Sequence, residues 1–129
     1  MANAEVVRAM IESWNRGDIE GFVKHLDPEV ELMPLRAELE GASYRGHEGA
    51  RRMYSDLHEE WEDLRLAPEV LEEIGDTVAV RITLTSRGRA SGVELAIPIS
   101  SLMRFRDRKV TRLQSFSDPD GAFRAAGAE

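Results

Sequence analysis

The order of the predicted elements is the feature that most constrains the fold of this chain. Apolar residues recur at helical spacing in three segments of the first half, and strand-like runs fill most of the remainder. Neighbouring strands joined by short turns pair antiparallel, and a long sheet of this kind twists and curls. An apolar helix must then cover its concave side. The order therefore predicts an α+β fold, in which a curved, mostly antiparallel sheet wraps around a long helix.

Two helices are expected at the start of the chain. Apolar residues recur at helical spacing after Asn3, which is positioned to cap the first helix. Gly17 is expected to end this helix, because glycine readily adopts the left-handed conformation that follows many helices. Asp18 can cap a second, short helix. We expect that helix to end at Asp27-Pro28, since the residue before a proline disfavours the helical conformation.

A third helix is predicted from Gly46 to about Trp61. Its apolar residues recur at intervals of three and four, and its opposite face is charged, which is typical of a helix that packs on one side. We expect this stripe to cover the concave face of the sheet. The stripe consists of Ala50, Met53, Tyr54, Leu57 and Trp61.

Five strands are expected after the second helix, and their alternation sets the two faces of the sheet. The clearest strand carries Val80, Ile82 and Leu84 on one face and Arg81 on the other. Pro98 predicts a bulge or an edge position in a long strand, because proline lacks the N–H that a ladder needs. The strands are expected at residues 29–35, 64–74, 77–87, 93–106 and 109–117, with a loop at 36–46 and a final helical turn capped by Asp118.

The composition excludes several classes of function. There is no cysteine, so disulfides, thiolate metal sites and cysteine nucleophiles are excluded. The three histidines are far apart and none has ligand spacing with a carboxylate, so we expect no metal. The formal net charge of −7 argues against nucleic-acid binding, because phosphates require a basic surface. We expect one domain over residues 1–129, cytoplasmic, without a membrane span or secretion signal.

Four short segments are informative through their order and spacing. They are Trp14-Asn15-Arg16-Gly17-Asp18, Tyr44-Arg45-Gly46-His47-Glu48-Gly49, Ser91-Gly92-Val93-Glu94 and Phe116-Ser117-Asp118. In these segments, and over nearly its whole length, the chain resembles SnoaL-like proteins of the nuclear transport factor 2-like superfamily, a group that includes ketosteroid isomerase, limonene epoxide hydrolase and polyketide cyclases. The resemblance implies a cone-shaped α+β barrel with a conical pocket for a small molecule and no cofactor. It does not by itself assign a reaction.

The resemblance also identifies what this chain lacks. By the match at Asn15 to Asp18, the oxyanion tyrosine of ketosteroid isomerase falls at Met10. By the match at Pro34 its aspartate base falls at Met33, and by the match at Pro98-Ile99 its protonated aspartate falls at Ser100. Only a supporting tyrosine of the third helix is kept, as Tyr54. Two methionines cannot transfer a proton, so the steroid-isomerase mechanism in its known form is excluded. The carboxylates of the epoxide hydrolase have no convincing counterpart either.

The expected hollow is mostly apolar. Methionine fills irregular spaces and suits an adaptable pocket, but a methionine and aromatic stripe also packs an ordinary core. Both interpretations stay open for residues that the helical and strand periods direct inward. The ligand-pocket candidates are Met10, Trp14, Met33, Met53, Trp61, Ile82, Leu84, Ser100 and Ser115.

Four residues are candidates for catalysis, each with a structural alternative. Tyr54 is the first, because a buried tyrosine hydroxyl needs a partner, in a ligand or in the protein. Glu31 would suit general-base work if it is buried, and otherwise lies hydrated near the start of a strand. His47 falls in the first turn of the third helix, where a loop contact is the alternative. Asp118 is a candidate acid or base and equally a helix cap.

Two functions remain open. The first is a pocket protein for a small hydrophobic molecule, acting as a cofactor-independent isomerase, cyclase or hydrolase. The second is a non-catalytic homodimeric domain that binds a ligand or has an accessory role. Its dimer contact would be the outer sheet face, which carries Arg81, Thr83 and Thr85.

Overall fold

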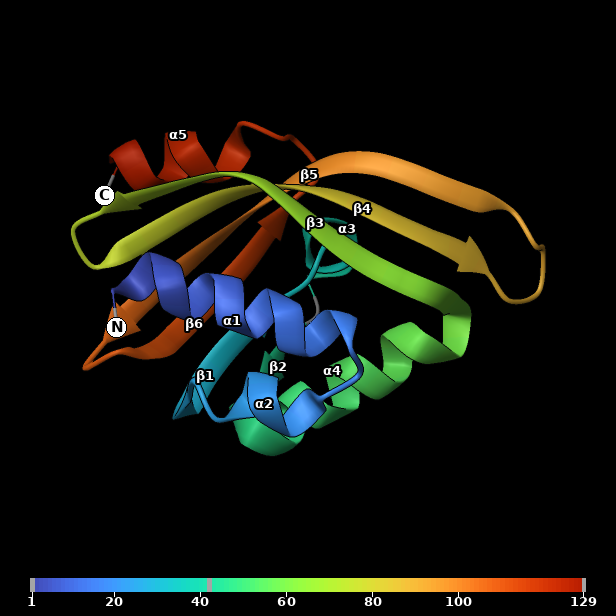
Figure 1. Ribbon diagram of the computed structural model, residues 1–129, viewed down its shortest axis with the longest axis horizontal. Coiled ribbons are helices and arrows are strands. Elements are labelled where there is room, and N and C mark those ends of the chain that lie inside the picture. Colours follow the sequence, from blue (N-terminus) through green and yellow to red (C-terminus); the bar gives the residue numbers. More distant parts are fainter. Residues whose placement is uncertain (1, 42, 129) are drawn as a thin grey trace.

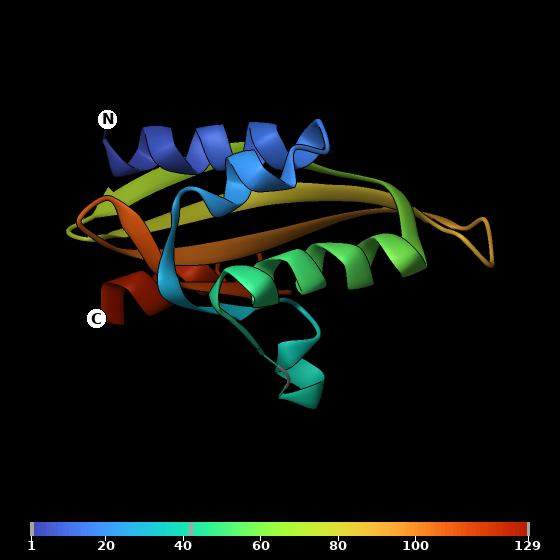
Figure 2. The same cartoon turned by 90° about the horizontal axis from the view of Figure 1, so that it is seen from below.

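Three helices cover one side of a curved sheet, and a fourth covers part of the other side (Figures 1 and 2). The computed structural model describes residues 2–41 and 43–128. The concave side carries α1 (Asn3–Asn15), α2 (Ile19–Val23) and α4 (Gly46–Glu60), and the convex side carries α5 (Gly121–Ala128). In this part of the chain no helix is long and apolar enough to cross a membrane.

The sheet has six strands in the order β2-β1-β6-β5-β4-β3. All neighbours pair antiparallel except β1 and β6, which are parallel. The predicted α+β class with a curved, mostly antiparallel sheet is therefore confirmed. The strands are β1 (Leu26–Met33), β2 (Tyr44–Arg45), β3 (Trp61–Ile74), β4 (Thr77–Gly88), β5 (Glu94–Arg106) and β6 (Lys109–Phe116).

The predicted boundaries of the first two helices are partly correct. Gly17 follows α1 with a φ of 76°, and the Asp18 carboxylate caps α2 by accepting a hydrogen bond from the Gly21 amide at 2.9 Å. Ala2, however, occupies the cap position of α1, and its amide donates to the Glu5 carboxylate at 3.1 Å. The sequence Asp27-Pro28 lies inside β1 and does not end a helix, because the register with β6 shifts between Leu26 and Glu31 and so tolerates a proline.

Pro98 occupies an edge position and no bulge. It pairs in register with Thr83 of β4, whereas pairing with β6 begins only at Ser100. The missing N–H of proline therefore costs no hydrogen bond on the open side. Two short elements in the predicted loop, α3 (Ala37–Glu40) and the strand β2, were not expected, and α5 begins at Gly121 and not at Asp118.

The core has two parts. The larger fills the concave side, and a smaller one lies beneath α5 around Ala79 and Leu102. Arg81 helps to fix α5, since its guanidinium forms an ion pair with Asp120 and lies 5.7 Å from the ring centre of Phe123. The helix α5 thus covers part of the outer sheet face that was expected to form the dimer contact. The dimer itself stays a prediction.

Candidate functional site

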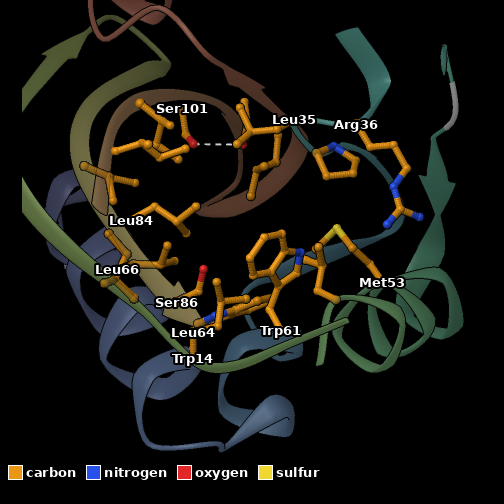
Figure 3. Close-up of a pocket in the computed structure, with 18 of the residues that line it drawn as sticks. Trp14, Leu35, Arg36, Met53, Trp61, Leu64, Leu66, Leu84, Ser86 and Ser101 are labelled. Carbon is orange, nitrogen blue, oxygen red and sulfur yellow. Dashed lines mark hydrogen bonds between the residues drawn. The ribbon is translucent and has the colours of Figure 1, made fainter. Parts of the chain in front are cut away.

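A cavity of about 310 Å³ lies between the concave face of the sheet and the helices α1 and α4 (Figure 3). Strand alternation determines which side chains reach it. Every second residue faces the cavity over residues 82–86 of β4 and residues 95–103 of β5, as do Leu64 and Leu66 of β3 and Leu113 of β6. The result is a wall that is almost entirely aliphatic and aromatic. From β4 and β5 it includes Ile82, Leu84, Ser86, Leu95, Ile97, Ile99, Ser101 and Met103.

Few polar groups reach the wall. Deep in the cavity the hydroxyl oxygens of Ser101 and Ser115 are 3.0 Å apart and share a hydrogen bond. Ser86 projects its hydroxyl from another part of the wall (Figure 3). At the exposed margin Arg36 donates a hydrogen bond to the Glu60 carboxylate at 2.9 Å. These two charges neutralise each other, so the site presents no net charge to a ligand.

Both tryptophans of the chain lie on the wall. Trp14 comes from α1 and is buried against Phe22 and Tyr54, with ring centres 5.3 Å and 5.0 Å away in edge-on contacts. Trp61 is the residue at which α4 gives way to β3, and its ring extends into the cavity (Figure 3). Any molecule in the cavity therefore lies close to two indole rings.

The structure brings together six of the nine proposed pocket residues, and they come from both the helices and the sheet. The six lie on the cavity wall: Trp14, Met53, Trp61, Ile82, Leu84 and Ser115.

The other three proposed pocket residues lie elsewhere. Met10 is fully buried in the core and does not reach the cavity. Ser100 pairs with Arg81 on the face that α5 covers, where its hydroxyl donates to the Asp118 carbonyl at 2.7 Å and accepts from the Ala122 amide at 2.9 Å. Its neighbour Ser101 faces the cavity instead.

Met33 is also directed away from the cavity. Met33 pairs with Gln114 of β6, whereas the residues of β6 that line the cavity are Leu113 and Ser115. The sulfur of Met33 lies 3.9 Å from the guanidinium of Arg112 on the other face. The positions that align with the ketosteroid isomerase groups therefore do not meet in this cavity.

Tyr54 lies behind the wall and not on it. Its ring stacks on His58 with centres 4.0 Å apart and contacts Trp14 on its edge. Its hydroxyl points toward the turn between α1 and α2, where a Cβ added to Gly17 would lie 3.6 Å from the oxygen. Tyr54 thus supports the tryptophan that forms the wall.

The remaining three catalytic candidates occupy separate places outside the cavity. Glu31 lies between Arg45 and Arg112, at 3.7 Å and 3.6 Å. His47 uses its Nε2 to hydrogen-bond the Leu26 carbonyl at 2.8 Å, which joins α4 to β1. These contacts give both side chains a structural explanation.

Asp118 is an exposed carboxylate beside α5. It forms an ion pair with Arg124 and accepts a hydrogen bond from the Asp120 amide at 2.8 Å. The Arg124 guanidinium, and then this amide, hold the pKa of Asp118 below its usual range. The group is therefore ionised and organises the turn before α5, although it does not cap that helix at its first residue as predicted.

Sequence reasoning missed four polar residues of the site. Ser86 and Ser101 could have been found, because each continues a strand alternation that also carries apolar wall residues. Arg36 and Glu60 had no such signal, since one lies in an irregular segment and the other ends a helix on its charged side.

A hydrogen bond in the segment before α4 makes stability depend on pH. Tyr44 donates to the Asp56 carboxylate at 2.6 Å, which raises the pKa of the tyrosine above its ordinary value of 10. Because the folded pKa is the higher one, this stabilisation is complete below pH 10 and is lost as the pH rises further. We expect Tyr44→Phe to lower the free energy of unfolding by about 0.5–1 kcal/mol at pH 8, measured by urea denaturation.

The same measurement at about pH 11 tests the cause. There the difference between wild type and Tyr44→Phe should be smaller, because the wild-type bond is weakened by ionisation. A difference that is equal at both pH values would show that packing of the ring, and not the bond to Asp56, accounts for it.

The fold and cavity together define a class: small α+β proteins of the NTF2-like fold that enclose a pocket beneath a curved sheet. Within this class, the chain belongs to the family described as the SnoaL-like domain, whose model matches residues 7–113. The predicted family is thereby confirmed, and the first three of the four sequence segments lie within the matched residues. The comparison with curated proteins gives no match.

Solved structures share the fold over almost the whole chain. An NTF2-like protein of unknown function from Burkholderia pseudomallei is 21% identical with a TM-score of 0.83, covering 96% of this chain and 97% of that one. A hypothetical protein with a ketosteroid isomerase-like fold from Catenulispora acidiphila, in complex with trimethylamine, is 16% identical (TM-score 0.80; 95% and 92% covered). TerC, co-crystallised with polyporic acid, is 25% identical (TM-score 0.81; 98% of each chain).

Proposed function

We propose that this protein binds one small, mostly apolar molecule in the cavity and that binding, without acid–base catalysis, is its function. The observation that carries the proposal is the cavity of about 310 Å³, whose lining side chains are apolar apart from three serine hydroxyls, two indole N–H groups and one marginal ion pair. This volume is at the lower end of the range for small-molecule sites. The relatives with trimethylamine and polyporic acid support the choice of a small molecule as the partner.

The chemistry of the wall favours binding over catalysis. General acid–base catalysis needs an ionisable group within hydrogen-bond reach of the substrate. Among the described residues that line the cavity, the ionisable ones are Arg36 and Glu60, and these are paired with each other at the margin. Tyr54, Glu31, His47 and Asp118 all lie off the wall, in separate surroundings.

A second candidate function, proton transfer by a cofactor-independent isomerase, cyclase or hydrolase, depends on Glu60. Its carboxylate reaches the cavity margin and Arg36 holds it in place. If the bound molecule is converted, Glu60→Gln should abolish turnover while leaving its affinity nearly unchanged. Turnover that survives this substitution would remove Glu60 as the base.

Intrinsic fluorescence tests the binding proposal, because both tryptophans lie on the cavity wall. Suitable probes are 1,4-naphthoquinone, which quenches indole emission, and polyporic acid. The chain has no cysteine, so a quinone has no thiol with which to react. We expect saturable quenching by at least one probe, and smaller quenching amplitudes in Trp14→Phe and Trp61→Phe than in the wild type.

Thermal unfolding provides an independent measurement. A ligand at ten times its Kd stabilises the folded state by about 1.4 kcal/mol, which should raise Tm by about 4–8 °C. Quenching that increases linearly with probe concentration, together with an unchanged Tm for both probes, would contradict the proposal.

A further inference from the structure

The Ser86 hydroxyl on the cavity wall has no hydrogen-bond partner among the described residues. Ser86 is 5% exposed and faces the cavity, and among the described residues nothing hydrogen-bonds its side chain. Its oxygen is not shut off from solvent inside the protein, so it stays accessible to whatever occupies the cavity. Figure 3 shows the Ser86 oxygen directed into the open space. The group is placed to bond a molecule inside the cavity.

A second polar point lies on the opposite part of the wall. Ser101 is 4% exposed and its hydroxyl lies 3.0 Å from that of Ser115. Only one of these two hydroxyls can donate to the other, so one O–H of the pair stays available to a ligand. Figure 3 shows Ser101 across the cavity from Ser86.

The strand register gives the separation of the two points. Ser101 pairs with Val80 of β4, and Ser86 lies six residues further along that strand. At about 3.3 Å per residue this is roughly 20 Å along the strand, and the concave curvature brings the two points closer in space. Between them the β4 side chains on the wall are Ile82 and Leu84, so an apolar stretch separates two polar ends.

From this arrangement we infer that Ser86 and the Ser101–Ser115 pair are the two polar anchors of the ligand, and that the ligand is an uncharged, elongated molecule with an apolar middle and a hydrogen-bonding oxygen near each end. The inference rests on the proposed binding function and specifies its ligand. An ionised ligand would lose hydration without gaining a counter-charge at either anchor. A ligand without a hydrogen-bonding atom at that end would leave the Ser86 hydroxyl unbonded.

Two probes with the same body test the inference. 4,4′-Biphenol carries an oxygen at each end, whereas 4-phenylphenol carries one. Isothermal titration calorimetry should show that the wild type binds 4,4′-biphenol about tenfold more tightly, the ratio expected for one additional hydrogen bond in a buried site. In Ser86→Ala and in the double variant Ser101→Ala/Ser115→Ala the affinity for 4,4′-biphenol should fall about tenfold, and its advantage over 4-phenylphenol should disappear. Ser55→Ala, which removes an exposed hydroxyl from α4, is the control and should match the wild type.

The outcomes separate this inference from the proposed function. If both probes bind but neither serine variant changes either affinity, the anchors are wrong while the binding function stands. If neither probe binds the wild type, and the quinone probes do not bind either, both proposals are overturned.

Discussion

Replacing Asn15 by leucine is expected to lower the free energy of unfolding by about 2–4 kcal/mol, because two hydrogen bonds of the backbone are lost at once. The Asn15 amide nitrogen donates to the Leu66 carbonyl at 2.8 Å, and its oxygen accepts from the Leu66 amide at 2.8 Å. Since β3 is an edge strand of the sheet, no neighbouring strand can satisfy these groups on that side. Asn15 therefore takes the place of a neighbouring strand.

A matched control lies on the same helix. Glu12 is exposed on α1, and Glu12→Leu should change the free energy of unfolding by no more than about 0.5 kcal/mol. Urea denaturation followed by circular dichroism measures both variants. A loss below about 1 kcal/mol in Asn15→Leu would show that water replaces the side chain without difficulty at this edge.

Replacing Leu84 by tryptophan is expected to reduce the affinity for 1,4-naphthoquinone by at least about 100-fold, because the larger ring fills the space that a ligand needs. Leu84 lies in the middle of the β4 part of the wall, between Ile82 and Ser86. Since the new ring enters an existing cavity, the free energy of unfolding should change by no more than about 1–2 kcal/mol. Calorimetry is the suitable measurement, as an added tryptophan alters the fluorescence.

Thr85→Trp provides the control for this substitution. Thr85 is the next residue of the same strand and faces the other side of the sheet. The control should bind 1,4-naphthoquinone as the wild type does. If Leu84→Trp and Thr85→Trp both bind normally, the ligand site is not this cavity.

The architecture could be predicted because the periods in the sequence are clear where one face of an element is buried. Ile82 and Leu84 alternate with more polar residues and do face the cavity. Met53 and Leu57 recur on α4 at helical spacing, and both reach the wall. In each case the side that packs inward is the side that the apolar residues mark.

The prediction of which side chains face the cavity was wrong where both faces of a strand are buried. In β5 the helix α5 covers Leu102 on one face while Ile99 and Ser101 face the cavity on the other. Leu102 on the second face weakens the alternation there, although Leu95, Ile97 and Ile99 still mark Ser101 as inward. The register with β4 decides that Ser100 faces α5. The same ambiguity applies to Leu32 and Met33 in β1, where the pairing of Leu32 with Leu113 decides which side chain turns inward.

Tyr54 shows a different limit of prediction. The apolar stripe of a helix spans a wide arc, and sequence spacing does not distinguish its centre from its margin. In α4 the centre of the arc faces the cavity through Met53, whereas Tyr54 lies toward the turn that contains Gly17. The packing of α4 against β1 and its other neighbours, among them Trp14 of α1, determines which of the two lines the cavity.

The position of Pro98 has a consequence for self-association. The part of β5 before Ser100 extends beyond β6 and leaves one row of backbone groups without a neighbouring strand. Exposed rows of this kind are where chains join edge to edge into aggregates. Proline offers no N–H to an incoming strand, and Glu94 adds a charge at the start of the same stretch. The protein can thus keep a long strand that shapes its cavity while protecting the unpaired part of that strand against polymerisation.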